Sequence, residues 1–281
     1  MNEENVRQEQ TKNKYEKKIG EEKVRERPLV APFARALSLL AAFGNDERWL
    51  GNLELSKRTG LPSSTVTRMA QSLVSLGYLH YEESIRKFSL APSVLALGYG
   101  VVDPPSVKKI VRERMSDFTR SHNVHLILCS RDKLDLIVID SHRTQAFPES
   151  LQLETGARID LTTPVAGWAL MAGLPEHERS YLSESLERKK PQSWRPLHRK
   201  FNDALNQVHK SGFCSSPLES NFPIPMVAAP LKVSDSSQLA IACMAPLSKM
   251  PRARLEFELG PALVSMATMI ENEGITHEIH R

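Results

Sequence analysis

Polar and basic side chains that could contact nucleic acid are concentrated in two short stretches, residues 63–71 and residues 86–87. Serine and threonine hydroxyls, and the free amides of a first helical turn, can reach phosphate oxygens or base edges. Glutamine can hydrogen bond to adenine in a bidentate manner. Arginine can neutralise a phosphate or bind guanine, and a base contact provides roughly 1–3 kcal/mol of discrimination. The candidate DNA contacts are Ser63, Ser64, Thr65, Thr67, Arg68, Gln71, Arg86 and Lys87.

The surrounding sequence predicts the helices that would present these side chains. Apolar residues recur every three to four positions in residues 33–41, which predicts a first helix that ends at Gly44-Asn45. Residues 53–58 predict a shorter second helix, and the glycine turn at 59–62 leads into a third helix over 63–76. Two helices joined by a tight turn are typical of a helix-turn-helix, whose second helix enters the major groove.

The third predicted helix separates its polar side chains from its apolar ones. One stripe is polar and the opposite stripe is apolar. The polar stripe consists of Ser64, Thr67, Arg68, Gln71 and Ser75, and the apolar stripe of Val66, Met69, Ala70, Leu73 and Val74. Gly77 can end this helix in a left-handed conformation. Residues 78–81 and 85–90, around a polar bend, predict a β-hairpin whose Arg86 and Lys87 lie where a wing meets DNA. Residues 31–102 are therefore interpreted as a winged helix-turn-helix domain.

The rest of the chain predicts a domain in which strands and helices interleave. We place the boundary at Asp103-Pro104-Pro105, where two prolines force an extended backbone, and expect a linker helix over 103–122. Residues 123–275 form the second domain, of α+β class, with an antiparallel sheet. Its expected strands are 124–129, 134–140, 226–233 and 239–245. A short helix near 92–99 is expected before the boundary, and helices of the second domain are expected near 166–172, 175–186, 197–211 and 254–270.

Several motifs stand in the order found in one known family. In the first domain they are Arg35-Ala36-Leu37, the segment from Thr59 to Arg68 (TGLPSSTVTR), Leu76-Gly77-Tyr78-Leu79 and Lys87-Phe88-Ser89-Leu90. They resemble the winged-helix domain of IclR-type bacterial transcriptional regulators. In the second domain they are Gly156-Ala157-Arg158, residues 163–172 (TPVAGWALMA), Gly212-Phe213 and Ala228-Ala229-Pro230. These resemble the family's GAF-like effector domain, so the resemblance covers Phe33 to Ile270.

The resemblance implies a regulator that binds double-stranded operator DNA and senses a small metabolite, often an organic or aromatic acid. It also implies a homodimer or a dimer of dimers. Assembly in pairs is expected on physical grounds, because one recognition helix reads few base pairs and binding to two half-sites raises the affinity for DNA.

The resemblance also places an effector pocket, in which this chain departs from the family. Trp168 stands where the family usually has Lys after the glycine at 167. The pocket positions would fall on Leu151, Ile159, Val165, Ala166, Ser216, Met226, Ala242 and Met244. Both hydroxyls of the last strand are lost, and with them polar groups that a small keto acid would need. We expect a more apolar effector, or a pocket that has lost sensing.

Composition narrows the class of protein without deciding its function. The chain has 281 residues, 41% hydrophobic and 25% charged, with a net charge of +4, which suits about two globular domains. Residues 1–30 predict a disordered charged tail that could also contact phosphates. No apolar run reaches the roughly 18 residues of a membrane span, and three scattered cysteines without a secretory signal indicate the cytoplasm.

Other constellations favour structural explanations. His122, His125 and Cys129 could suggest a metal site, but the strand spacing separates His122 from the other two. Cys129, Cys214 and Cys243 are expected as buried thiols. Neither a phosphate-binding glycine loop nor a nucleophile elbow is present. We therefore expect no catalytic residues, metal or cofactor.

Three hypotheses follow, in order of preference. The first is a ligand-responsive transcriptional regulator that controls a catabolic operon and is not an enzyme. Its helix over residues 63–76 would bind in the major groove of the DNA. The second is an enzyme on the α+β scaffold, which the absence of a convergent acid, base and nucleophile set disfavours. The third is a winged-helix adaptor that binds protein instead of DNA, or a regulator without an effector response.

Overall fold

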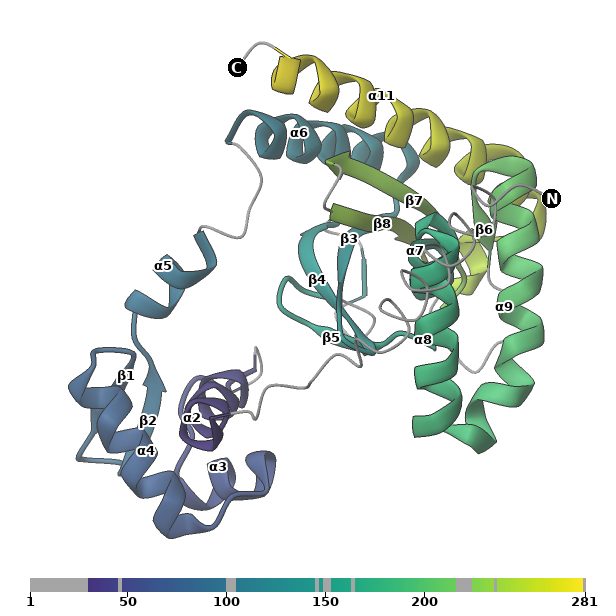
Figure 1. Ribbon diagram of the computed structural model, residues 1–281. Helices are drawn as coiled ribbons and strands as arrows, with labels where there is room; N and C mark the ends of the chain where they lie inside the picture. Colours follow the sequence, from purple (N-terminus) through teal and green to yellow (C-terminus); the bar gives the residue numbers. More distant parts are fainter. Residues whose placement is uncertain are drawn as a thin grey trace, which may run out of the picture. The chain divides into compact units, whose positions relative to one another are not determined.

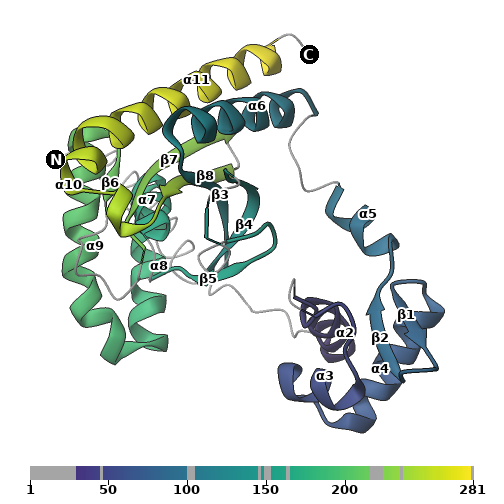
Figure 2. The same cartoon turned by 180° about the vertical axis from the view of Figure 1, so that it is seen from behind.

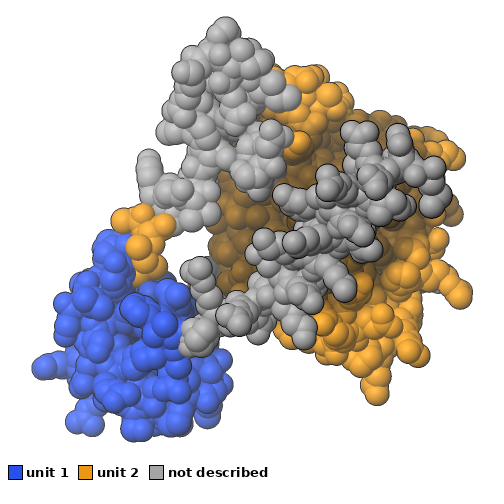
Figure 3. Space-filling view, viewed as in Figure 1, with its two compact units in different colours: residues 1–43, 47–93 blue, residues 44–46, 94–281 orange. Residues whose placement is uncertain are grey.

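The computed structural model describes two compact units (Figure 3). The described residues are 30–44, 47–99, 105–144, 147–148, 153–162, 165–215, 224–234 and 237–279. The first unit comprises residues 1–43 and 47–93, and the second comprises residues 44–46 and 94–281. The predicted tail, apart from Val30, and the predicted boundary between 102 and 103 lie outside the described residues and stay predictions.

The first unit is a helical cluster followed by a hairpin, as predicted (Figure 1). Its helices are α2 (Ala31–Ala41), α3 (Asn52–Thr59) and α4 (Ser63–Ser75), and its strands are β1 (Leu79–Glu82) and β2 (Lys87–Leu90). The two strands pair in antiparallel fashion. The core consists of Leu39, Leu50, Leu55, Val66, Ala70, Leu73, Leu79 and Phe88. Both stripes of α4 therefore lie as its periodicity predicted.

The described part of the second unit is built around a six-stranded antiparallel sheet in the order β5-β4-β3-β8-β7-β6. The strands are β3 (His125–Asp132), β4 (Asp135–His142), β5 (Arg158–Asp160), β6 (Cys214–Ser215), β7 (Met226–Ser234) and β8 (Ser237–Met244). The α+β class and the antiparallel sheet are confirmed. No helix in the described part of the chain is long and apolar enough to cross a membrane.

Helices cover both faces of this sheet (Figures 1 and 2). Helices α6 (Pro105–His122) and α11 (Gly260–Ile279) lie side by side on one face, and α7 (Val165–Gly173) lies on the other, with α9 (Pro191–Ser211) packed outside α7. The remaining helical segments are α5 (Ser93–Tyr99), α8 (Glu176–Lys189), η2 (Leu247–Lys249), α10 (Arg252–Arg254) and the π-helical η3 (Leu255–Leu259). Because both faces are covered, residues 226–231 of β7 and 239–244 of β8 are apolar on both sides of the sheet.

Helix α9 and strands β3, β5 and β6 differ from the sequence expectation. Helix α9 begins at Pro191, before Pro196, because buried Trp194 extends the apolar stripe that continues at Phe201. Strand β3 continues past residue 129, where the expected strand ended, to Asp132, and the turn falls at Lys133, which has a left-handed φ of 59°. The short strands β5 and β6 were not expected, since two or three residues carry no detectable alternation.

Candidate functional site

The polar face of α4 is exposed along its length. Ser63, Ser64, Thr67, Arg68 and Gln71 are exposed, whereas Thr65 is half-buried at the edge of the polar face. No side chain caps the helix at Pro62, so its first-turn amides are not satisfied by a cap. Arg68 forms no ion pair with another described residue. This face can therefore offer hydroxyls, amides and one free guanidinium to DNA.

The turn before α4 is held by local hydrogen bonds. Gly60 ends α3 with a left-handed φ of 70°, and its amide donates to the Ser56 carbonyl at 2.9 Å. The Ser56 hydroxyl donates to the Leu61 carbonyl at 2.6 Å. Since every bond joins near neighbours in the sequence, the angle between the two helices is encoded locally.

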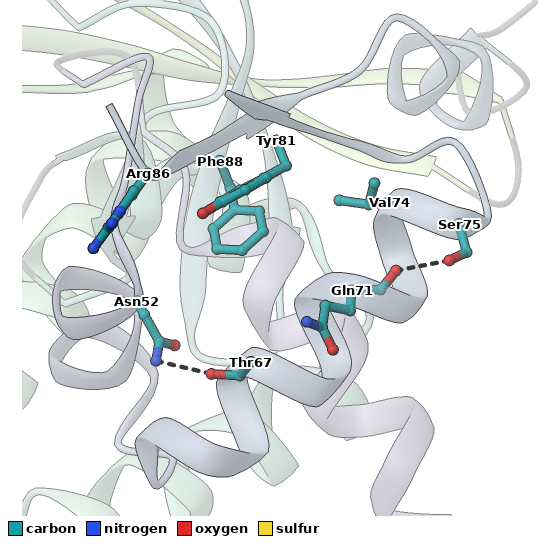
Figure 4. Close-up of a pocket in the computed structure, with 8 residues that line it drawn as sticks. All are labelled: Asn52, Thr67, Gln71, Val74, Ser75, Tyr81, Arg86 and Phe88. Atoms are coloured by element: carbon teal, nitrogen blue, oxygen red, sulfur yellow. Dashed lines mark hydrogen bonds between the residues drawn. The ribbon is translucent and has the colours of Figure 1, made fainter. Parts of the chain in front are cut away.

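The hydroxyl of Thr67 is already engaged (Figure 4). It donates to the Ser63 carbonyl at 3.0 Å and accepts from Asn52 Nδ2 at 2.9 Å. A hydroxyl has one proton and two lone pairs, so one lone pair and the methyl group remain for DNA. Asn52 is thus a positioning residue that the sequence reading missed, because only the packing of α3 on α4 brings it to Thr67.

A groove of about 450 Å³ lies between α4 and the hairpin. Its lining residues are Asn52, Thr67, Gln71, Val74, Ser75, Tyr81, Arg86 and Phe88. The Tyr81 ring lies against Phe88, with 4.9 Å between ring centroids, and its hydroxyl points into the groove (Figure 4). Tyr81 is 45% exposed and was also missed, since its strand position alone did not show which side of the hairpin borders α4.

The two basic residues of the hairpin differ in their surroundings. Arg86 is exposed in the turn, with a left-handed φ of 54°, and forms no ion pair with a described residue. Lys87 is half-buried, and its Nζ lies 3.4 Å from Glu54 Oε1. The hydrogen bond from the Gly51 amide, with help from Lys87, lowers the pKa of Glu54 below its ordinary value. Arg86 is therefore the better placed of the two to contact a phosphate.

The second unit gathers most of the predicted effector residues on one sheet face, here called the α7 face. Met226 of β7 pairs with Met244 of β8, and Ala242 lies two residues from Met244 on the same face. Val165 and Ala166 begin α7, which covers this face: the Cys214 thiol donates to the Val165 carbonyl at 3.8 Å. These five predicted effector residues, Val165, Ala166, Met226, Ala242 and Met244, are each at most 2% exposed.

The other three predicted pocket residues are not placed beside this group. Ile159 lies at the edge of the sheet on β5, where it pairs with Leu136 and is half-buried. Leu151 and Ser216 lie outside the described residues. The effector roles of all eight positions stay predictions.

Trp168 lies away from the α7 face of the sheet. A side chain on Gly173 would overlap Pro230 and Gln238, so this side of α7 faces the strands, and Ala166 shares it. Trp168 is on the opposite side of the helix, 3% exposed, and its indole N–H has no hydrogen-bond acceptor among the described residues. Its substitution for the family's lysine therefore does not put an indole against Met226 and Met244.

The three cysteine thiols are buried, and within the described part of the chain the histidines near Cys129 form no metal site with it. Burial raises the pKa of Cys129 and of Cys243 to about 12 and raises the pKa of Cys214 further. His122 Nδ1 lies 3.3 Å from Glu258, away from His125 on β3. Among the described residues, no group of three or more His, Cys, Asp or Glu side chains could hold a metal ion.

Sequence comparison relates the chain to a family of DNA-binding proteins. A model of the IclR helix-turn-helix domain matches residues 33–83. The chain is 26% identical to the HTH-type transcriptional regulator TsaQ1/TsaQ2 of Comamonas testosteroni, covering 87% of this chain and 88% of that protein. It is 23% identical to the p-hydroxybenzoate hydroxylase transcriptional activator of Acinetobacter baylyi, covering 89% and 94%.

Structural comparison extends the likeness to both units. An IclR family transcriptional regulator from Brucella abortus has a TM-score of 0.73 and 27% identity, covering 90% of this chain and 95% of that one. An IclR homologue from Microbacterium hydrocarbonoxydans, complexed with 4-hydroxybenzoate, has a TM-score of 0.65 and 16% identity, covering 89% and 99%. The second likeness shows a shared fold.

Proposed function

The chain belongs to the IclR family of transcriptional regulators, and on this premise we propose that α4 reads operator DNA under the control of a small organic acid. Such regulators are not enzymes. The proposal includes a homodimer or dimer of dimers acting in the cytoplasm, and an effector of aromatic or apolar character bound in the second unit.

The exposed polar face of α4, bordered by the groove that ends at Arg86, is the observation that carries this proposal. Ser63, Ser64 and the first-turn amides suit phosphate contacts, and Gln71 suits adenine. Arg68 suits a phosphate or a guanine. Thr67 is assigned a narrower role than expected, because its hydroxyl proton is used within the helix and its methyl group suits a thymine methyl.

The chemistry of the α7 face supports an aromatic or apolar effector. Met226, Ala242 and Met244 supply no charge and no hydroxyl to this face, and methionine adapts well to flat aromatic ligands. Two relatives point the same way: one activates transcription of p-hydroxybenzoate hydroxylase, and one homologue was solved with 4-hydroxybenzoate. We therefore propose control of an operon for the catabolism of such an acid.

A mobility-shift assay at near-physiological salt tests DNA binding. The probe is the DNA just upstream of the protein's own gene and of the neighbouring operon, with competitor DNA present. We expect a discrete, competitor-resistant complex that Arg68→Ala weakens about tenfold or more. Arg35→Ala, an exposed arginine of α2 outside the groove, is the matched control.

The salt dependence separates the two roles of Arg68. A phosphate contact predicts a uniform loss of affinity and a shallower salt slope, and a base contact predicts loss at one base pair. The spacing of protected half-sites reports the symmetry of the assembly. If no protein–DNA complex forms at any salt concentration, the DNA-binding proposal fails and the hypothesis of a protein-binding adaptor remains.

A further inference from the structure

His125 is a fully buried polar residue on the α7 face. It is 0% exposed and pairs across the sheet with Met244, which in turn pairs with Met226. Directly paired residues of antiparallel strands point to the same side of a sheet. The imidazole therefore stands in one row with two of the predicted effector residues. Phe147 covers it edge-on, with 4.8 Å between the ring centroids and 75° between the rings.

The hydrogen bonds of His125 determine which ring nitrogen carries the proton. Its Nε2 lies 2.9 Å from the Ser141 hydroxyl, and that hydroxyl donates to the Leu153 carbonyl at 2.9 Å. Because the serine proton is used by a carbonyl that can only accept, Ser141 must accept from His125, and Nε2 carries hydrogen. Burial, assisted by Arg143, lowers the pKa of His125 to about 4. The ring is thus neutral near pH 7, and Nδ1 holds a lone pair.

That lone pair has no partner among the residues that the structure describes. Nδ1 is buried, and no group among the described residues hydrogen bonds to it. A buried acceptor without a donor is costly, and an apolar ring would fill the same place without that cost. The arrangement is explained if a donor reaches Nδ1 in a liganded state.

We propose that Nδ1 of His125 accepts a hydrogen bond from a hydroxyl group of the effector, so that the second unit selects a hydroxylated aromatic acid. This inference rests on the proposed function. A carboxylate has no proton to donate at neutral pH, so the hydroxyl end of the ligand, and not its carboxylate, faces His125. The side chains of Met226 and Met244 lie beside it on the same face and suit the aromatic ring.

Calorimetric titration of the full-length protein tests this assignment. The probes are 4-hydroxybenzoate, 3-hydroxybenzoate and benzoate, which differ in the presence and position of the hydroxyl donor. We expect the wild-type protein to bind one hydroxylated probe at least about tenfold more tightly than benzoate. His125→Phe should bring this ratio close to one, and Ile127→Val, a matched packing change two residues along the same strand face, should preserve it.

A second measurement on the wild-type protein does not depend on a variant that folds. Long-range proton–nitrogen NMR spectra of the histidine rings report which nitrogen of His125 is protonated. We expect a protonated Nε2 and a bare Nδ1 in the free protein. Adding the preferred hydroxylated probe should shift the Nδ1 resonance in the direction of a hydrogen-bonded acceptor.

The possible outcomes separate this inference from the function on which it rests. Binding of benzoate as tight as that of both hydroxylated probes, or a preference that survives in His125→Phe, overturns the role of His125 and leaves an aromatic effector intact. Binding of none of the probes overturns both the aromatic effector and the role of His125. An unchanged Nδ1 resonance in a saturated complex also overturns the assignment.

Discussion

The α4 face of the first unit and the α7 face of the second unit handle polar groups in opposite ways. On α4 most of the polar side chains are exposed, and the Thr67 hydroxyl bonds to the Ser63 carbonyl and to Asn52 of α3. On the α7 face the His125 imidazole is fully buried, and its Nδ1 has no hydrogen-bond partner among the described residues. Substitutions on α4 should therefore change binding more than stability, and those around the α7 face should change stability first.

The largest expected effect tests how tightly α7 is held. A Cβ atom on Gly167 would overlap the Leu161 carbonyl oxygen, which belongs to the backbone and cannot rotate away. Gly167→Ala should lower the free energy of unfolding by more than about 3 kcal/mol. For a unit of this size that corresponds to a drop in Tm of about 10 °C, measured by calorimetry.

A matched glycine substitution shows whether the loss comes from packing. Gly44→Ala should cost little, because nothing lies within 4 Å of its added Cβ and its φ is not left-handed. Equal losses for Gly44→Ala and Gly167→Ala would contradict the close approach of α7 to Leu161.

The next effect is a pH dependence from His125. Its pKa is about 4 in the folded state and 6.5 ordinarily, so below pH 6.5 the unfolded chain takes up a proton that the folded unit does not. The stabilisation is thus fully present above pH 6.5 and is lost as the pH falls toward 4, by up to about 1.4 kcal/mol per pH unit. Urea unfolding across this range should show the loss, and His125→Phe should flatten it.

Asp140 provides an internal reference for that experiment. Burial alone would raise its pKa, but the nearby His142 ring and hydrogen bonds from Arg112 and the Ser141 amide outweigh burial and hold the pKa at about 2. The stability that Asp140 contributes is present above its ordinary value of 3.8 and is lost only between there and pH 2. A loss near pH 5 that persists in His125→Phe would therefore rule out His125 as its cause.

A smaller effect is expected at the turn of the helix-turn-helix. Gly60 has a left-handed φ of 70° and open space around it, so Gly60→Ala introduces backbone strain without a clash. The expected cost is about 1–2 kcal/mol of unfolding free energy. Gly60→Asn should cost less, because asparagine tolerates this conformation better. Equal stability of all three proteins would show that the turn adopts another conformation.

The smallest effect concerns the contact between α3 and α4. Asn52 Nδ2 donates to Thr67 Oγ1 at 2.9 Å across an exposed edge. Asn52→Ala and Thr67→Val, alone and together, should reveal a coupling energy of about 1 kcal/mol in denaturant unfolding. Additive losses would mean that the two side chains act independently and that Asn52 does not position Thr67.

The DNA-facing surface could be predicted because its determinants are close in sequence. The spacing of Val66, Ala70 and Leu73 sets the buried side of α4, and the glycine at 60 sets the turn before it. Helical periodicity converts such spacing directly into a face. The engagement of Thr67 by Asn52 could not be read this way, since it depends on how two helices pack.

The position of the His125 imidazole on the α7 face depends on tertiary structure alone. Residues 125, 226 and 244 are far apart along the chain, and only the register of β3, β8 and β7 puts them in one row. The sequence showed that the last strand lacks hydroxyls at Ala242 and Met244, but not that His125 lies beside them with an Nδ1 that no described residue hydrogen bonds. Local periodicity encodes which side chains a helix exposes, whereas partners across a sheet depend on strand order and register, which a single strand's sequence does not contain.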